Sequence, residues 1–216
     1  MTVALIGIAL FLLVLLLVFE KRENTAGKLF TKTPLSVLFV AAAWLQPDPG
    51  QAYAQWMLMG FVLCLIGDIC LVYSSRNKLF LSGLAAFLCG HVFYVIAFYS
   101  ITDISVWTWG ALGVLVVVSV VVFSWLRPFL GNMVGPVIAY ILVISLMVSG
   151  AASLFGDPSA NAVGRWLVFI GAISFFLSDL FVARQQFVRD AYVNRSVGLP
   201  LYYLGQFMLA FSIAYI

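Results

Sequence analysis

The chain alternates between long apolar runs and short polar or turn-forming segments such as Pro47-Asp48-Pro49-Gly50. An α-helix of about 20 apolar residues crosses the hydrocarbon core of a bilayer. We therefore predict eight spanning helices, near 2–19, 33–46, 53–73, 79–100, 105–125, 132–154, 164–183 and 198–216. The run at 33–46 is the shortest, and we expect a tilted or half-buried span there.

The composition agrees with an all-α, polytopic transmembrane bundle. Hydrophobic residues fill 64% of the 216 positions and charged residues 9%, whereas a soluble protein has about 25% charged residues. No soluble linker or low-complexity tract divides the chain, so we expect a single integral membrane domain over 1–216. The net charge of +3 is small and dispersed, which argues against a nucleic-acid partner.

Lysine and arginine are concentrated in alternate connecting segments. Ten of the eleven follow the first, third, fifth and seventh runs: Lys21, Arg22, Lys28, Lys32, Arg76, Lys78, Arg127, Arg184, Arg189 and Arg195. Because basic residues stay on the cytoplasmic side of a membrane, both termini are expected outside. We expect a multi-pass protein of a bacterial inner membrane, with a retained first helix and periplasmic termini.

Two carboxyl groups, those of Asp68 and Asp179, lie inside apolar runs. A carboxylate at the bilayer centre costs about 2.5–3.5 kcal/mol on insertion scales, so such residues are rare and usually functional. Both lie roughly 6–8 Å from the same predicted boundary, at 1.5 Å per helical residue. If they face one cavity, repulsion and desolvation keep one of them protonated, as a general acid beside a carboxylate base requires. The alternative is a pair of structural hydrogen-bonding residues.

Other polar side chains are predicted near these aspartates. They are His91, Tyr94, Tyr140, Tyr202 and Gln206. His91 and Tyr94 belong to an aromatic stripe with helical spacing, and Tyr202 and Gln206 share one helix face. The histidine is alternatively a packing residue, and Lys32, at the entry of the second run, is alternatively a snorkelling anchor.

Small residues predict close helix packing. They form two seams and a GxxxG motif: Gly60, Cys64 and Gly67; Gly83 and Gly90; Gly131 and Gly135. The third and fourth runs, like the seventh and eighth, show an aspartate, a basic loop and then a polar residue. This order hints at a duplication, which the sequence similarity alone does not establish.

Motifs of several enzyme classes are absent from the sequence. A single histidine cannot form a three-histidine zinc site, and the sequence has no HExxH, GxSxG or Walker A motif. We therefore expect no metal and no other cofactor. Two functions other than an enzyme are open alternatives. One is a proton- or cation-coupled transporter of a small amphiphile, and the other is a lipid-binding structural protein.

The segment Gly67-Asp68-Ile69-Cys70-Leu71, followed by Gly83, Phe87, His91 and Tyr94, resembles the signature of the YhhN-like lysoplasmalogenase family. Gly171-Ala172 with Ser178-Asp179, Pro136 with Tyr140, and Tyr202 with Gln206 resemble its later motifs. The resemblance covers the chain from about Lys32 to the C-terminus. It departs where Thr33 separates Lys32 from Pro34, because the family commonly has Lys-Pro adjacent there.

The resemblance implies a metal-independent hydrolase that cleaves the vinyl ether of lysoplasmalogens, releasing a fatty aldehyde and glycerophospho-ethanolamine or -choline. One aspartate would protonate the alkene, and the other would stabilise the resulting cation and accept a proton from water. The lysophospholipid substrate and membrane lipids are the expected partners. The expected substrate-binding residues are Lys32, His91, Tyr94, Tyr140, Ser178, Tyr202 and Gln206.

Overall fold

The computed structural model describes residues 2–48, 50–73 and 77–216, and this part of the chain contains helices and no strands. The long helices are α1 (Thr2–Lys21), α2 (Thr25–Trp44), α3 (Ala52–Val72), α4 (Asn77–Tyr99), α5 (Val106–Leu126), α6 (Val134–Ser153), α7 (Ala162–Ala183) and α8 (Tyr192–Ser212). Short 3₁₀ turns follow α5, α6 and α8 and precede α6, and a π-helical turn, η4 (Arg184–Val188), follows α7. The prediction of an all-α bundle is confirmed.

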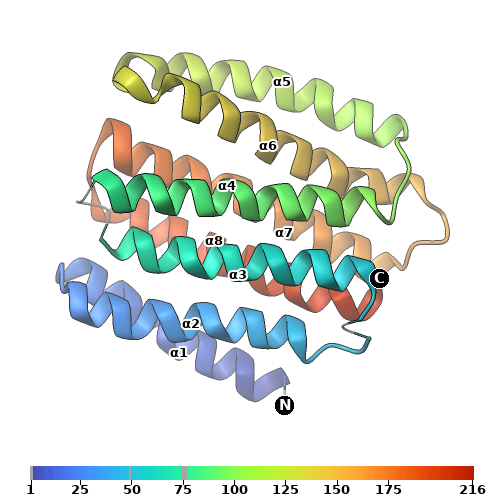
Figure 1. Ribbon diagram of the computed structural model, residues 1–216, viewed down its shortest axis with the longest axis horizontal. Coiled ribbons are helices and arrows are strands. Elements are labelled where there is room, and N and C mark those ends of the chain that lie inside the picture. Colours follow the sequence, from blue (N-terminus) through green and yellow to red (C-terminus); the bar gives the residue numbers. More distant parts are fainter. Residues whose placement is uncertain (1, 49, 74–76) are drawn as a thin grey trace.

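The helices run up and down along one common direction (Figure 1). Helices α3, α4, α7 and α8 form the middle of the bundle, with α1 and α2 on one side and α5 and α6 on the other. The two termini lie at one end, and the turns after α1, α5 and α7 lie at the opposite end, where most of the basic residues are found. Arg76 lies outside the described residues. The assignment of the termini to the periplasmic side stays a prediction.

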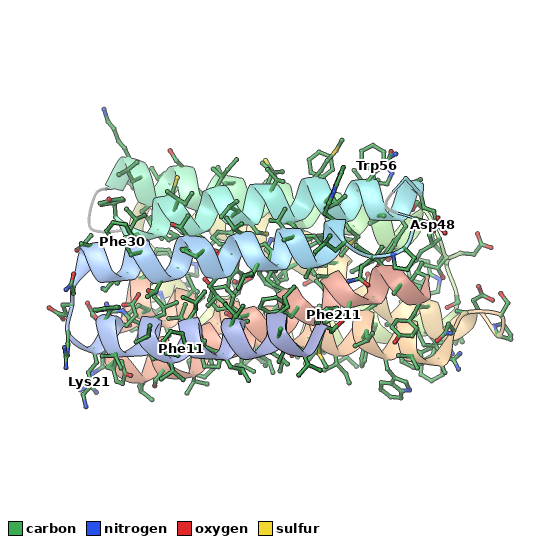
Figure 2. All side chains as sticks on the ribbon, turned by 90° about the horizontal axis from the view of Figure 1, so that it is seen from below. Phe11, Lys21, Phe30, Asp48, Trp56 and Phe211 are labelled. Atoms are coloured by element: carbon green, nitrogen blue, oxygen red, sulfur yellow. The ribbon has the colours of Figure 1, made fainter. Side chains whose placement is uncertain are left out.

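The outer surface of the bundle is apolar. Phe11 and Phe30 are 63% and 77% exposed, and Figure 2 shows their side chains on the outside, with Lys21 and Asp48 near opposite ends. Among the described residues, seven of the helices are long and apolar enough to span a membrane. Helix α2 is long enough but more polar, because it carries Lys28 and Lys32. The protein is therefore a multi-pass integral membrane protein.

Two predicted spans differ from the observed helices. The second begins at Thr25 instead of 33, with the Asn24 side chain accepting a hydrogen bond from the Gly27 amide at 2.9 Å. The last begins at Tyr192 instead of 198, and its regular part ends at Ser212 instead of 216. The apolar pattern missed both beginnings because the segments 25–32 and 192–197 contain polar residues, of which Thr31, Lys32 and Asn194 are buried.

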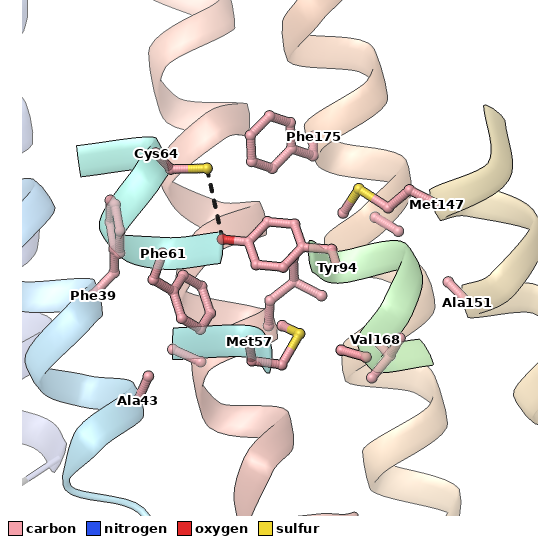
Figure 3. Packing of buried hydrophobic residues seen from close by; sticks show 14 of the residues in the cluster. Phe39, Ala43, Met57, Phe61, Cys64, Tyr94, Met147, Ala151, Val168 and Phe175 are labelled. Carbon is pink, nitrogen blue, oxygen red and sulfur yellow. Dashed lines mark hydrogen bonds between the residues drawn. The ribbon is translucent and has the colours of Figure 1, made fainter. Parts of the chain in front are cut away.

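Aromatic and small residues fill the core. Figure 3 shows Tyr94 packed near Phe61, with its hydroxyl directed at the Cys64 sulfur, 3.7 Å away. The close packing predicted from the small residues of α3 and α4 is confirmed. A Cβ added at Gly60 or Gly90 would lie 3.1 Å from the backbone oxygen of the other glycine. The helices α3 and α4 approach closely at this crossing.

The GxxxG motif does not mediate the close helix packing that was predicted for it. Within the part of the chain that the structure describes, a Cβ at Gly131 or Gly135 would meet no atom within 4 Å. Gly131 instead has a φ of +48°, in the left-handed region that glycine adopts most readily, and lies in the 3₁₀ turn that precedes α6. Its role in this structure is to turn the chain.

Candidate active site

A partly open cavity of about 220 Å³ lies at the end of the bundle where most of the basic residues are found. Its polar lining includes Lys32 of α2, Asp68 of α3, Tyr140 of α6, Asp179 of α7 and Tyr202 of α8. The remaining wall is mostly apolar and includes Phe80, Leu84, Phe87, Val122, Leu126 and Ile141. Asp68 and Asp179 both lie four residues before the last residue of their helices. The cavity thus brings the two predicted carboxyl groups to one level.

Asp68 is buried and fully paired. Its Oδ1 lies 2.9 Å from the Lys32 Nζ, and both side chains are at most 9% exposed. Its Oδ2 accepts hydrogen bonds from the hydroxyls of Ser36 and Tyr202, each at 2.6 Å. Three charged or hydroxyl groups from α2 and α8 therefore hold the carboxyl group of α3, which is the arrangement that stabilises an anion.

A hydrogen-bonded chain extends from Asp68 into the core. The Gln206 amide donates to the Tyr202 hydroxyl at 3.1 Å, and the Tyr94 hydroxyl donates to Gln206 Oε1 at 2.9 Å. Gln206 and Tyr94 are fully buried and do not line the cavity. Their position behind Tyr202 gives them a supporting role, because they fix the ring that contacts Asp68.

Asp179 has different surroundings. The Tyr140 hydroxyl donates to its Oδ2 at 2.9 Å, and the side chain is 17% exposed. The His91 Nε2 lies 3.8 Å from the same oxygen, which is too far for a hydrogen bond. Neither Lys nor Arg forms an ion pair with Asp179 within the described residues.

The orientation of His91 indicates its tautomer. Its Nδ1 lies 2.6 Å from the Phe87 backbone oxygen, so we assign the ring proton to Nδ1. In a neutral ring Nε2 is then an acceptor, and this buried atom has no hydrogen-bond partner in the described structure. His91 in this tautomer therefore offers Asp179 no hydrogen that would stabilise a carboxylate.

Phe175 connects the two carboxyl environments. Its ring makes edge-to-face contacts with His91 at 4.5 Å and with Tyr202 at 5.2 Å between centroids. These rings exclude water from the space behind the cavity, so the electrostatic interactions at Asp68 and Asp179 are weakly screened.

The structure brings together all nine residues that the sequence singled out, in two groups. Six line the cavity: Lys32, Asp68, Tyr140, Ser178, Asp179 and Tyr202. Three lie behind it: His91, Tyr94 and Gln206. The Ser178 hydroxyl donates to the Gly198 backbone oxygen at 3.0 Å, which joins α7 to α8. Lys32 is a buried ion-pair partner, so the alternative of a snorkelling anchor is wrong.

Sequence reasoning missed five polar residues of this region. Ser36 contacts Asp68, and the Tyr203 hydroxyl lies 3.1 Å from the Ser36 hydroxyl. Glu20, Lys28 and Arg195 line the mouth of the cavity, although the sequence indicated only loop charges for Lys28 and Arg195 and no role for Glu20. The spacing of Lys28, Lys32 and Ser36, each four residues apart, is the signal that a polar face on α2 was available.

Among the residues that the structure describes, no three His, Cys, Asp or Glu side chains are grouped so as to hold a metal ion. The polar groups that line the cavity are carboxyl, hydroxyl, amide, ammonium and guanidinium groups.

Comparison with known proteins relates this chain to one family. The model of the YhhN family matches residues 27–213. Lysoplasmalogenase TMEM86B from Rattus norvegicus is 31% identical over 166 residues, which are 76% of this chain and 64% of the relative. Lysoplasmalogenase from Mycobacterium tuberculosis is 27% identical over 177 residues, 80% of this chain and 63% of the relative. The matches thus span slightly less than two thirds of these relatives. No solved structure shows significant similarity.

Proposed function

The chain belongs to the YhhN family, and we propose that it is a lysoplasmalogenase-like hydrolase. Its substrate would be a lysophospholipid with a vinyl ether at the sn-1 position. The products would be a fatty aldehyde and a glycerophospho-alcohol such as glycerophosphoethanolamine or glycerophosphocholine. Relatives that carry the name lysoplasmalogenase support this activity.

One observation carries the proposal: two carboxyl groups in different environments line one cavity with a mainly apolar wall. The apolar wall suits an alkenyl chain, and the carboxyl groups suit acid–base chemistry. The level of both aspartates, one helical turn from the helix ends, suits a lipid whose ether lies just below its head group.

The chemistry of a vinyl ether sets what the site must supply. A proton is added to the β-carbon of the alkene, and the electron pair of the double bond forms the new C–H bond. The α-carbon becomes an oxocarbenium ion, which water attacks with loss of a proton to a base. The resulting hemiacetal loses the glycerol oxygen as an alcohol, and the carbonyl of the aldehyde forms. No metal or cofactor is needed for these steps.

We assign the acid role to Asp179. In the described structure it has no Lys or Arg partner, and the donor that it meets, the Tyr140 hydroxyl, is neutral. A buried carboxylate without a cation is costly, so this group is better suited to carry the proton. Asp68 faces Lys32 and two hydroxyl donors, and we assign it as the anion that stabilises the oxocarbenium ion and accepts the proton of water.

The other polar residues position these two groups. Tyr140 would stabilise the carboxylate that Asp179 becomes after proton transfer. Tyr202, held by Gln206 and Tyr94, would fix Asp68. Tyr202 and Lys32 also line the cavity, so both are candidates for contact with the glycerol oxygens.

The test is release of fatty aldehyde from a lysoplasmalogen by the purified protein, detected by mass spectrometry without added metal or nucleotide. Asp179→Asn and Asp68→Asn should each lower kcat by about 10²–10⁴-fold, the usual contribution of a general acid or base. Asp103→Asn is the matched control, because Asp103 is exposed at the opposite end of the bundle.

Size-exclusion profiles in detergent would establish that each variant is folded. Aldehyde formation by folded Asp179→Asn at the parent rate would contradict the acid assignment. Absence of aldehyde from folded parent protein would contradict the proposed function, and gradient-driven flux in liposomes would then support a transporter.

A further inference from the structure

Three charged residues from three helices meet at the mouth of the cavity. Glu20 is in the last turn of α1, Lys28 in the first turn of α2 and Arg195 in the first turn of α8, and all three line the cavity. The Glu20 Oε2 lies 2.9 Å from Lys28 Nζ and 3.4 Å from Arg195 Nε. We refer to these three residues as the mouth cluster.

The mouth cluster is more buried than ordinary surface charges. The side chains of Glu20, Lys28 and Arg195 are 12%, 14% and 23% exposed. Both cations share one oxygen of Glu20, yet among the described residues this oxygen accepts no hydrogen bond of regular geometry. Desolvating charges is costly, and an incompletely satisfied ion pair stabilises a fold poorly. The arrangement is therefore better explained by groups that exchange partners with a ligand.

The position of the mouth cluster relative to Asp68 matches the length of a lipid head group. Lys28 and Lys32 lie one helical turn apart on α2, a rise of about 6 Å, and Lys32 contacts Asp68. In a glycerophospholipid the three glycerol carbons separate the sn-1 ether oxygen from the phosphate ester by a similar span. A substrate with its ether near the aspartates would thus carry its phosphate close to Lys28.

The charges of the mouth cluster also match those of a zwitterionic lipid head group. Two cations and one carboxylate provide partners for an anionic phosphate and for the cationic amine that follows it in ethanolamine or choline. Arg195 offers several N–H donors in a fork that fits phosphate. Its Nη2 also lies 2.9 Å from Oδ1 of Asp190, whose side chain is 70% exposed, so this contact is exposed to water and is readily given up to a ligand.

We propose that Glu20, Lys28 and Arg195 form a clamp for a zwitterionic phospholipid head group, with Lys28 and Arg195 on the phosphate and Glu20 on the amine. This proposal rests on the proposed function for the identity of the lipid. Under this proposal the mouth cluster determines the specificity for the head group, and the aspartates do not.

The experiment measures binding and needs no turnover. The probes are two saturated alkyl-ether lysolipids that have no vinyl group: a 1-alkyl-glycerophosphoethanolamine and the matching 1-alkyl-glycerol 3-phosphate, which lacks the amine. Isothermal titration in detergent should show that Glu20→Gln weakens binding of the ethanolamine lipid about tenfold and leaves the phosphate lipid unchanged or bound more tightly. Lys28→Gln and Arg195→Gln should weaken binding of both lipids.

The controls are Glu23→Gln and Arg189→Gln, which change the same charges at exposed positions outside the cavity lining. If Glu20→Gln weakens both lipids equally, or neither, the head-group clamp is wrong and the mouth cluster only joins helices. If Glu20→Gln does not fold, the affinities of the parent protein for the two lipids are compared instead, and equal affinities overturn the proposal. Because the probes cannot be hydrolysed, this result is independent of whether lysoplasmalogen yields aldehyde.

Discussion

Replacing Lys32 with methionine removes one charge of the Lys32–Asp68 pair and keeps a long flexible side chain. The pair has a 2.9 Å contact with 9% and 1% exposed side chains. Removing one partner of a buried ion pair typically costs about 3–5 kcal/mol, because the other charge stays buried without compensation. Asp68 keeps the hydroxyls of Ser36 and Tyr202, so we expect a loss near the lower limit, about 3 kcal/mol.

This loss is large enough to measure by thermal unfolding. For a chain of this size, 1 kcal/mol shifts Tm by about 2–4 °C, so Lys32→Met should unfold about 6–12 °C below the parent protein. Tryptophan fluorescence of protein in detergent provides the assay. Lys21→Met, the same change at an exposed residue, should stay within about 2 °C.

A double variant separates loss of the pair from loss of packing. Lys32→Met with Asp68→Asn removes both charges, so the uncompensated carboxylate of the single variant is gone and Tm should recover most of the loss. The reasoning is refuted if Lys32→Met unfolds together with Lys21→Met. It is also refuted if the double variant is less stable than Lys32→Met alone.

Two further predictions concern the hydrogen bond from Tyr140 to Asp179 and the packing of α3 on α4. Tyr140→Phe deletes the donor to Asp179 and keeps the ring, so kcat for aldehyde release should fall about tenfold with KM little changed; an unchanged kcat would contradict the role of the hydroxyl. Gly67→Ala places a Cβ 2.6 Å from the Phe87 ring, whereas Gly135→Ala meets no atom within 4 Å. The first should lower Tm by several degrees and the second should not, and equal Tm values would disprove the close packing of α3 on α4.

The number and approximate position of the helices could be predicted because the membrane imposes a length and an apolar composition on every span. The beginnings of α2 and α8 could not, since their first turns carry charge. Lys28 and Arg195, read as loop residues, belong to these turns. They are polar because they face a cavity, and hydropathy along the chain does not distinguish a cavity from the water outside.

The level of Asp68 and Asp179 in the membrane could also be predicted, because helical rise converts sequence position into depth. Their partners could not. Most of these helices are apolar on every side, so the pattern does not reveal which face of α3 is turned to α2. The contacts of Asp68 with Lys32 and Ser36 join residues 36 and 32 positions apart, and they depend on how two helices are rotated against each other.

The structure supports the hint of duplication. Helices α3 and α4 cross at a pair of glycines, and so do α7 and α8, where a Cβ at either glycine would lie 2.9–3.2 Å from the backbone oxygen of the other. The glycines at the two crossings are Gly60 and Gly90, and Gly171 and Gly205. In each pair the first glycine precedes the aspartate of its helix by eight residues, and the second is followed at once by a buried polar residue, His91 or Gln206.

Two similar helix pairs thus present one carboxyl group each to the same cavity. The helix that precedes each pair contributes a side chain that contacts this carboxyl group. Helix α2 supplies Lys32 to Asp68, whereas α6 supplies Tyr140 to Asp179. A symmetric scaffold with two identical sites would place two equal carboxyl groups together, and neither would be favoured as acid or base. The difference between an ammonium group and a phenol at these two positions would assign the two roles in the proposed acid–base chemistry.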